Sequence, residues 1–119
     1  MTRSPAKEST VDSHHHFWRE GESHQPWRLP EHDVLVRDFL PADMRPQMDA
    51  AGVRHSVLVQ SVNTADENTR MLRFAEEAGT VAGIVGWLPL EDPAGAEEML
   101  PAFVAEPRMR GVQFSWSPR

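Results

Sequence analysis

Three consecutive histidines, His14 to His16, are the residues whose type and spacing best fit chemistry. Side chains alternate between the two faces of a strand, so His14 and His16 share one face, about 6.6 Å apart along the backbone, and His15 takes the other. Two imidazoles at this spacing can converge on one divalent ion, about 2.1 Å from each nitrogen. Asp12, on the same face, can hold the second ring nitrogen of a histidine. Such an ion lowers the pKa of bound water to about 7, which is hydrolytic chemistry.

Two ligands alone do not make a catalytic metal site, because catalytic zinc usually has three protein ligands. The remaining histidines, His24, His32 and His55, lie in loop or pre-strand positions, where a solvated side chain is the simpler interpretation. The alternative for the histidine pair is a polar strand end that faces water. His15 is expected to be structural, either packed outside the strand or exposed.

The composition bounds the class of protein. The chain has 119 residues, which suits one domain, and 39% hydrophobic with 25% charged residues is a globular composition. A net charge of −6 argues against a nucleic-acid partner, and no apolar run is long enough to span a membrane. The absence of cysteine excludes disulfides and thiolate metal sites. The polar residues 1–9 predict a short flexible tail without a secretory signal, and hence a cytoplasmic protein.

The elements that must position the histidines alternate along the chain. Short β-branched or apolar runs predict four strands, at residues 9–16, 56–61, 81–87 and 109–116. Helix signals between them predict three helices, within residues 41–52, 64–80 and 92–107. A long polar excursion, residues 19–38, separates the first strand from the first helix and is expected to be functional or mobile. Such alternation indicates βαβ units with right-handed crossovers.

The ends of the helices follow from their capping residues. In the first helix Asp43 can act as the cap and Gly52 as a left-handed stop, and Pro46 fits only in a first turn, which predicts a short helix. The second helix is expected to have Thr64 or Asp66 as its cap and Gly79 as its stop. Its apolar face comprises Met71, Leu72, Ala75 and Ala78. The third helix has an apolar stripe of Ala96, Met99, Leu100, Phe103 and Val104, and Pro101 should kink or restart it.

The predicted fold class is α/β, with parallel βαβ units forming the first half of a (β/α)8 TIM barrel over residues 10–119. Four parallel strands leave two open edges, and parallel sheets are normally covered on both faces. A complete barrel of this type needs roughly 250 residues, about twice this chain.

Several stretches resemble one known family. The motif VDSHHHFW, residues 11–18, resembles the first-strand motif of the amidohydrolase superfamily, in particular the amidohydrolase-related lactonases that act on sugar-acid lactones and pyrone dicarboxylate. Residues 35–53 look like the first helix region of that branch, residues 56–79 like its second strand and helix, and VAGIVGWLPLEDP and MRGVQF like its third and fourth strands. The resemblance covers nearly everything after residue 10.

The resemblance implies a barrel hydrolase whose site lies at the C-terminal ends of the strands. His14 and His16 match the paired first-strand histidines of the family, with Asp12 in support. In metal-dependent members these histidines bind one divalent ion, such as zinc or manganese; in other members, which need no metal, they bind substrate or orient water. The implied partner is a small molecule, a lactone or a carboxylate-bearing ring.

The resemblance would also place Gln60, Trp87 and Gln113, at the C-terminal ends of later strands, near the mouth of the barrel and against that substrate. For Gln60 the alternative is a polar residue that closes a strand end, and for Trp87 it is packing in the wall. Trp18 and Trp27, on the excursion, can stack on a ring-shaped substrate, or they can pack in the core or a lid.

This sequence also departs from the family pattern. Gln113 stands where family members commonly have an arginine suited to grip a carboxylate. The later histidines and the eighth-strand aspartate of the family lie beyond residue 119, so the chain looks like an N-terminal portion with little or no turnover alone. The alternative functions are a non-enzymatic half-barrel that pairs with a second copy or a separate partner, such as the missing C-terminal half, and can bind a metal through His14 and His16, and a small flavodoxin-like binding domain.

Overall fold

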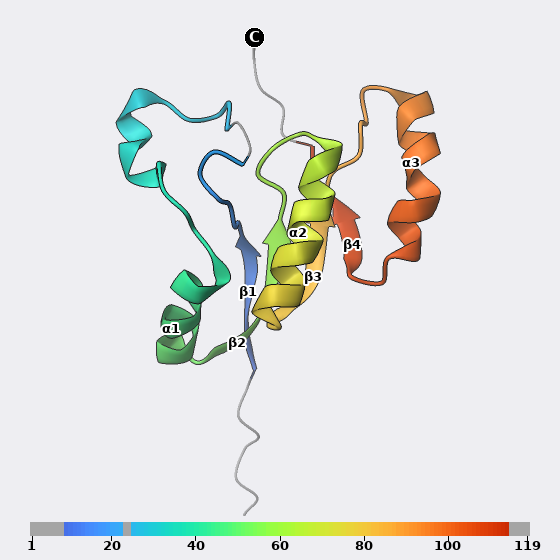
Figure 1. The fold of residues 1–119 in the computed structure, drawn as a ribbon. Helices are drawn as coiled ribbons and strands as arrows, with labels where there is room; N and C mark the ends of the chain where they lie inside the picture. The colour runs from blue at the N-terminus through green and yellow to red at the C-terminus, as the bar shows by residue number, and fades with distance from the viewer. Residues whose placement is uncertain (1–8, 23–24, 115–119) are drawn as a thin grey trace, which may run out of the picture.

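A parallel sheet positions the histidines. The computed structural model describes residues 9–22 and 25–114, which form a sheet of four strands in the order β1-β2-β3-β4 (Figure 1). The strands are β1 (Thr10–His15), β2 (Val53–Val59), β3 (Val81–Gly86) and β4 (Met109–Val112). All three neighbouring pairs are parallel, which confirms the predicted arrangement. The end of the fourth predicted strand, residues 115–116, lies outside the described residues, as does most of the predicted tail.

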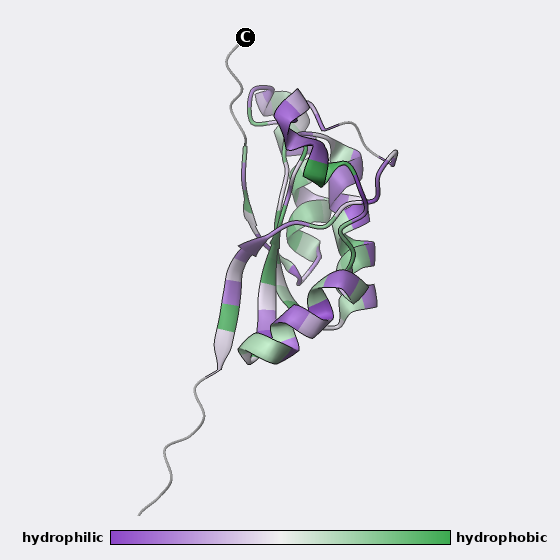
Figure 2. Ribbon diagram, turned by 90° about the vertical axis from the view of Figure 1, so that its left-hand side faces the viewer, coloured by the Kyte–Doolittle hydropathy of each residue, from purple (hydrophilic) through white to green (hydrophobic). Residues whose placement is uncertain are grey.

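Helices follow the first three strands and lie on one face of the sheet (Figure 2). They are α1 (Pro41–Ala51), α2 (Ala65–Ala78) and α3 (Pro93–Ala105), and a 3-10 helix, η1 (Pro30–Leu35), lies within the excursion. The carboxyl ends of the strands lie at one end of the sheet, the upper end in Figure 1, where η1 also lies. Within the described part of the chain, no helix covers the opposite face of the sheet (Figure 2).

The core lies between the sheet and α2. Leu58 of β2 and Ile84 of β3 are fully buried against the helix. The helix contributes Met71, Phe74 and Ala75, and Phe17, just after β1, completes the cluster. The predicted apolar face of this helix is confirmed, because Met71 and Ala75 are buried and Leu72 and Ala78 pack against the cluster, but the prediction missed Phe74. Gly79 ends the helix with a φ of 70°, as expected of a left-handed stop.

The beginning of α1 differs from the prediction. The helix begins at Pro41, after the N-cap Leu40, and Asp43 is its third residue. The Asp43 carboxylate accepts a hydrogen bond from the Leu40 N–H, 2.9 Å away, so Asp43 satisfies the helix start from inside the first turn. Pro46 therefore lies inside a helix of 11 residues rather than in its first turn. The predicted stop, Gly52, is confirmed by its φ of 71°.

Helix α3 has an apolar face that the described residues do not bury. Pro101 lies within one helix rather than at a restart, and none of the helix's residues is buried. Leu100 is 44% exposed and Val104 is 66% exposed. Of the predicted apolar stripe, Ala96, Met99 and Phe103 are half-buried, whereas Leu100 and Val104 face away from the described part of the protein.

The excursion folds back on the end of β1. Trp18 and Phe39 exchange two backbone hydrogen bonds of 3.0 and 2.9 Å, which bring the two ends of the excursion together. The Trp18 indole N–H donates to the Arg37 carbonyl at 3.0 Å. Arg28 lies 5.6 Å from the Trp18 ring and forms an ion pair of 2.8 Å with Glu20. These contacts hold the excursion over the carboxyl end of the sheet.

Candidate active site

The end of β1 brings His14 and His16 together. Their ring centroids are 5.1 Å apart and the rings are nearly perpendicular, at 81°. His14 is exposed and His16 is half-buried. The Nδ1 of His16 lies 2.8 Å from the Val59 carbonyl oxygen. Because a carbonyl can only accept, Nδ1 carries the proton, and in the neutral ring Nε2 keeps its lone pair.

His15 lies on the other side of the strand, as alternation predicts. Its Nε2 is 2.8 Å from the Ser56 hydroxyl, and its ring packs edge-on against Phe17 at 4.7 Å between centroids. Burial lowers the pKa of His15 below its ordinary value, and this effect exceeds the opposing effect of the Asp12 carboxylate. The surroundings of His15 thus favour the neutral ring and a structural role.

Asp12 does not hold the second nitrogen of His16. That nitrogen is bound by Val59, and the Asp12 carboxylate instead accepts a hydrogen bond of 3.0 Å from the backbone N–H of His14. The expected support therefore acts on the backbone: Asp12 fixes the strand conformation at the first histidine of the pair. This departure from the expected role of Asp12 coincides with an irregularity in β1, whose pairing with β2 shifts register between Asp12 and His15.

A cavity of about 440 Å³ opens beside His16 at the carboxyl end of the sheet. Its lining residues are His16, Trp18, Trp27, Leu35, Gln60, Ser61 and Gln113. They come from three strand ends and from the excursion, which closes one side. The volume lies in the range of small-molecule sites, and a mostly apolar lining with a few amides is typical of them.

Three of the predicted substrate residues meet at this cavity. Gln60 is only 1% exposed, and its amide Nε2 donates to the Gln113 carbonyl at 3.1 Å and to Asn63 at 3.3 Å. The Gln113 backbone N–H in turn donates to the Gly86 carbonyl at 2.9 Å. Trp27 donates from its indole nitrogen to Gln25 at 2.9 Å. The ends of β2 and β4 are thereby joined across the end of β3.

Trp87 is the exception among the predicted substrate residues. It follows β3 directly, but it does not line the cavity beside His16. Both backbone groups of Trp87 are bound by Asn68 of α2. The alternative interpretation for its side chain, packing in the wall, stays a prediction.

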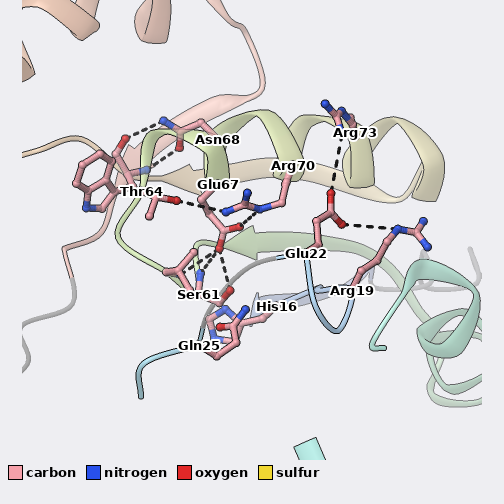
Figure 3. Close-up of polar contacts among 12 residues, drawn as sticks. His16, Arg19, Glu22, Gln25, Ser61, Thr64, Glu67, Asn68, Arg70 and Arg73 are labelled. Atoms are coloured by element: carbon pink, nitrogen blue, oxygen red, sulfur yellow. Dashed lines mark hydrogen bonds and ion pairs between the residues drawn. The ribbon is translucent and has the colours of Figure 1, made fainter. Parts of the chain in front are cut away.

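The prediction missed Ser61 and Leu35 as lining residues, and it missed Glu67. The sequence did contain a signal for Glu67, because Thr64-x-x-Glu67 has the form of a capping box, in which the glutamate binds the backbone of the cap residue. The structure departs from this form: Glu67 reaches past Thr64 to Ser61 and Val62 (Figure 3).

The remaining histidines do not join the pair. His32 lies in η1, where its Nδ1 accepts a hydrogen bond of 3.0 Å from the Leu29 N–H. His55 is exposed near the beginning of β2, and His24 lies outside the described residues. Across residues 9–22 and 25–114, no group of three or more His, Cys, Asp or Glu side chains is arranged to hold a metal ion. In the same ranges, no helix is long and apolar enough to cross a membrane.

The amidohydrolase family profile matches residues 11–119, nearly the whole chain. An L-fucono-1,5-lactonase of Burkholderia ambifaria is 31% identical over 103 residues, which are 87% of this chain and 35% of the relative. An L-fucono-1,5-lactonase of Burkholderia multivorans is 37% identical over 89 residues, which are 75% of this chain and 30% of the relative. The chain thus spans about a third of the length of these curated relatives.

Solved structures agree with the family match. A crystal structure of an amidohydrolase from Burkholderia multivorans with bound zinc has a TM-score of 0.75 and 34% identity, and the match covers 88% of this chain and 36% of that one. Another crystal structure of an amidohydrolase from the same organism, with bound HEPES, has a TM-score of 0.76 and 33% identity. The four strands and their helices are the first half of a (β/α)8 barrel. Motif, fold and relatives agree, and this chain belongs to the amidohydrolase family.

Proposed function

We propose that this chain provides the first-strand side of a site that hydrolyses the lactone of a sugar acid. The observation that carries the proposal is the position of His16, whose Nδ1 is bound to Val59 and which lines a cavity of small-molecule size. The L-fucono-1,5-lactonases among the relatives support the substrate class. L-Fucono-1,5-lactone is therefore the substrate that we propose to test first.

His14 and His16 fit the first two ligands of a divalent ion, and the ion bound in a relative makes zinc the first candidate. The fit is partial, because the described residues supply no third ligand. A bound zinc ion would polarise the lactone carbonyl and activate water. With or without an ion, the Val59 carbonyl holds the His16 ring so that Nε2 can bind an ion, accept a proton or orient a water molecule.

The cavity wall fits a polar ring. The Gln60 side-chain amide donates a hydrogen bond to the Gln113 carbonyl, which connects the ends of β2 and β4 in this wall. Trp27 and Trp18, with ring centroids 5.7 Å apart, provide an aromatic side against which a sugar ring can pack. No carboxylate and no arginine lines the cavity within the described residues. We therefore propose that this wall recognises the hydroxyl groups of the sugar, which the lactone and its hydrolysis product, L-fuconate, share.

Binding of zinc by the purified chain tests the role of the histidine pair. In calorimetric titrations with zinc we expect His14→Ala and His16→Ala each to weaken binding at least tenfold. The matched control is His55→Ala, since His55 is an exposed histidine near the beginning of β2 and should leave zinc affinity within twofold. Equal zinc affinity in all four proteins would contradict the assigned role.

Binding of L-fuconate, the product of the proposed hydrolysis, tests the substrate class separately. We expect it to change the tryptophan fluorescence of the chain, and we expect Trp27→Ala to abolish that change. Turnover of L-fucono-1,5-lactone by these residues alone should be slow, because the described cavity contains no carboxylate to act as general base. Fluorescence that does not respond to L-fuconate would contradict the proposed substrate class.

A further inference from the structure

A buried carboxylate holds the loop that follows β2. Glu67, in the first turn of α2, is only 3% exposed. Its Oε2 accepts three hydrogen bonds, from the Ser61 N–H and hydroxyl at 2.8 Å each and from the Val62 N–H at 3.1 Å (Figure 3). Its Oε1 faces the Arg70 guanidinium at 3.3 Å. Every one of these donors except Arg70 belongs to the loop, so Glu67 fixes the conformation of the chain directly after Gln60.

The next residue of α2 holds the loop that follows β3. The Asn68 side-chain oxygen accepts a hydrogen bond of 2.8 Å from the Trp87 N–H, and its amide donates to the Trp87 carbonyl, also at 2.8 Å. Gly86 lies against this pair, because a Cβ there would come within 2.6 Å of the Asn68 oxygen. Figure 3 shows both contacts leaving the same turn of the helix toward the strand ends.

Both loops lead to the cavity wall. Ser61 lines the cavity itself, and Gln60 precedes it. Gly86, which precedes Trp87, accepts the backbone hydrogen bond of Gln113, another lining residue. Neither Glu67 nor Asn68 lines the cavity, so whatever effect they have on a ligand must pass through the loops that they hold.

The contacts of Glu67 are not those of a carboxylate that only stabilises a helix. A glutamate at this position of a capping box would bind the backbone of the cap residue, Thr64, but no side-chain cap hydrogen bond is formed there. Burying a charge has a desolvation cost that is offset only when all its hydrogen bonds are made, and an apolar residue of similar volume is often no less stabilising. The three bonds to the loop therefore point to control of its geometry.

We propose that Glu67 and Asn68 are positioning residues of the candidate site, which set the wall formed by Ser61, Gln60 and Gln113 from behind. This inference rests on the proposed function. The first turn of α2 acts as a template for two adjacent loops, so a change of one atom there should alter ligand binding without touching the ligand. The zinc ligands His14 and His16, and the Val59 carbonyl that holds His16, lie outside the two loops, so zinc binding should not respond.

The test compares Glu67→Gln and Asn68→Ala with Glu76→Gln, a control at an exposed glutamate of the same helix. We expect both test variants to weaken L-fuconate binding at least tenfold while zinc affinity stays within twofold. NMR amide exchange should accelerate at Ser61 and Val62 in Glu67→Gln and at Trp87 in Asn68→Ala. Restoration of a carboxylate by Glu67→Asp should recover part of the protection, whereas Glu76→Gln should resemble the wild-type chain.

The outcomes separate this inference from the proposed function. Amide exchange needs no ligand, so unchanged exchange in Glu67→Gln overturns the positioning role whatever the chain binds. Failure of the wild-type chain to bind L-fuconate overturns the proposed substrate class, and faster exchange confined to the two loops would still support the positioning role. Equal losses of zinc and L-fuconate binding, or failure of both test variants to fold, would assign the two residues to stability alone and overturn it.

Discussion

Each of the three adjacent histidines is defined by the atoms it meets. The Val59 carbonyl sets the protonated nitrogen of His16, the Ser56 hydroxyl and Phe17 surround His15, and His14 stays exposed. The sequence predicted which two histidines share a face, because alternation depends only on position along a strand. It could not predict that Val59, 43 residues away, would bind His16 in place of Asp12, because that partner is brought there only by the pairing of β1 with β2.

The stability of the chain should decrease as the pH falls through the histidine range, and His15 should contribute to this. Burial lowers the pKa of His15 in the folded chain, whereas in the unfolded chain it titrates near its ordinary value of about 6.5. Above that pH His15 is neutral in both the folded and the unfolded chain, so it does not lower the free energy of unfolding. Below it the unfolded state binds the proton first, so the free energy of unfolding falls until the folded pKa is passed.

Urea unfolding of the wild-type chain and of His15→Gln at pH 7.5, 6.5 and 5.5 measures this effect. The wild-type chain should be more stable than the variant at pH 7.5, and the difference should narrow toward pH 5.5. His55→Gln replaces an exposed histidine, so its free energy of unfolding should differ from that of the wild-type chain by the same amount at all three pH values. A difference for His15→Gln that widens as the pH falls would show that the protonated ring is the favoured form.

At the scale of elements, local signals predicted the stops of two helices, and tertiary contacts decided the rest. Gly52 and Gly79 end α1 and α2 in the left-handed conformation, as their positions indicate. Asp43 is a third residue rather than a cap, since a carboxylate can satisfy the same orphan N–H groups from either place. The role of Glu67 depends on a loop whose course no local pattern specifies.

The end of β3 should tolerate no side chain at Gly86. A Cβ there would approach the Asn68 oxygen at 2.6 Å, Phe103 at 2.9 Å and the Met109 sulfur at 3.1 Å. Gly86→Ala should therefore lower the free energy of unfolding by about 1–3 kcal/mol, as overpacking in a core does. In Gly111→Ala the new methyl would meet only Val85, at 3.8 Å, so the change should be within about 0.5 kcal/mol. Thermal and urea unfolding of the two variants measures the contrast, and equal effects would contradict it.

At the scale of the whole molecule, the described residues present surfaces that a barrel normally covers. β1 pairs only with β2 and β4 only with β3 within the described ranges, and one face of the sheet has no helix over it there (Figure 2). The match to the zinc-bound amidohydrolase structure covers only 36% of that chain. The hydrophobic pattern of α3 correctly predicted an apolar face, but a pattern within one segment does not predict which other part of a protein packs against that face.

A polypeptide of these 119 residues should therefore associate with itself in solution. Strands with free edges are templates for another chain, and the exposed Leu100 and Val104 of α3 add apolar area whose burial is favourable. Sedimentation velocity at increasing concentration should show dimers or larger species, and Leu100→Glu with Val104→Glu should shift the distribution toward the monomer. Ala42→Glu with Ala50→Glu, which adds the same two negative charges at exposed positions of α1, should leave it unchanged. A discrete dimer would favour two half-barrels closing on each other, a broad distribution would favour unspecific pairing of edges, and a monomer at every concentration would contradict both.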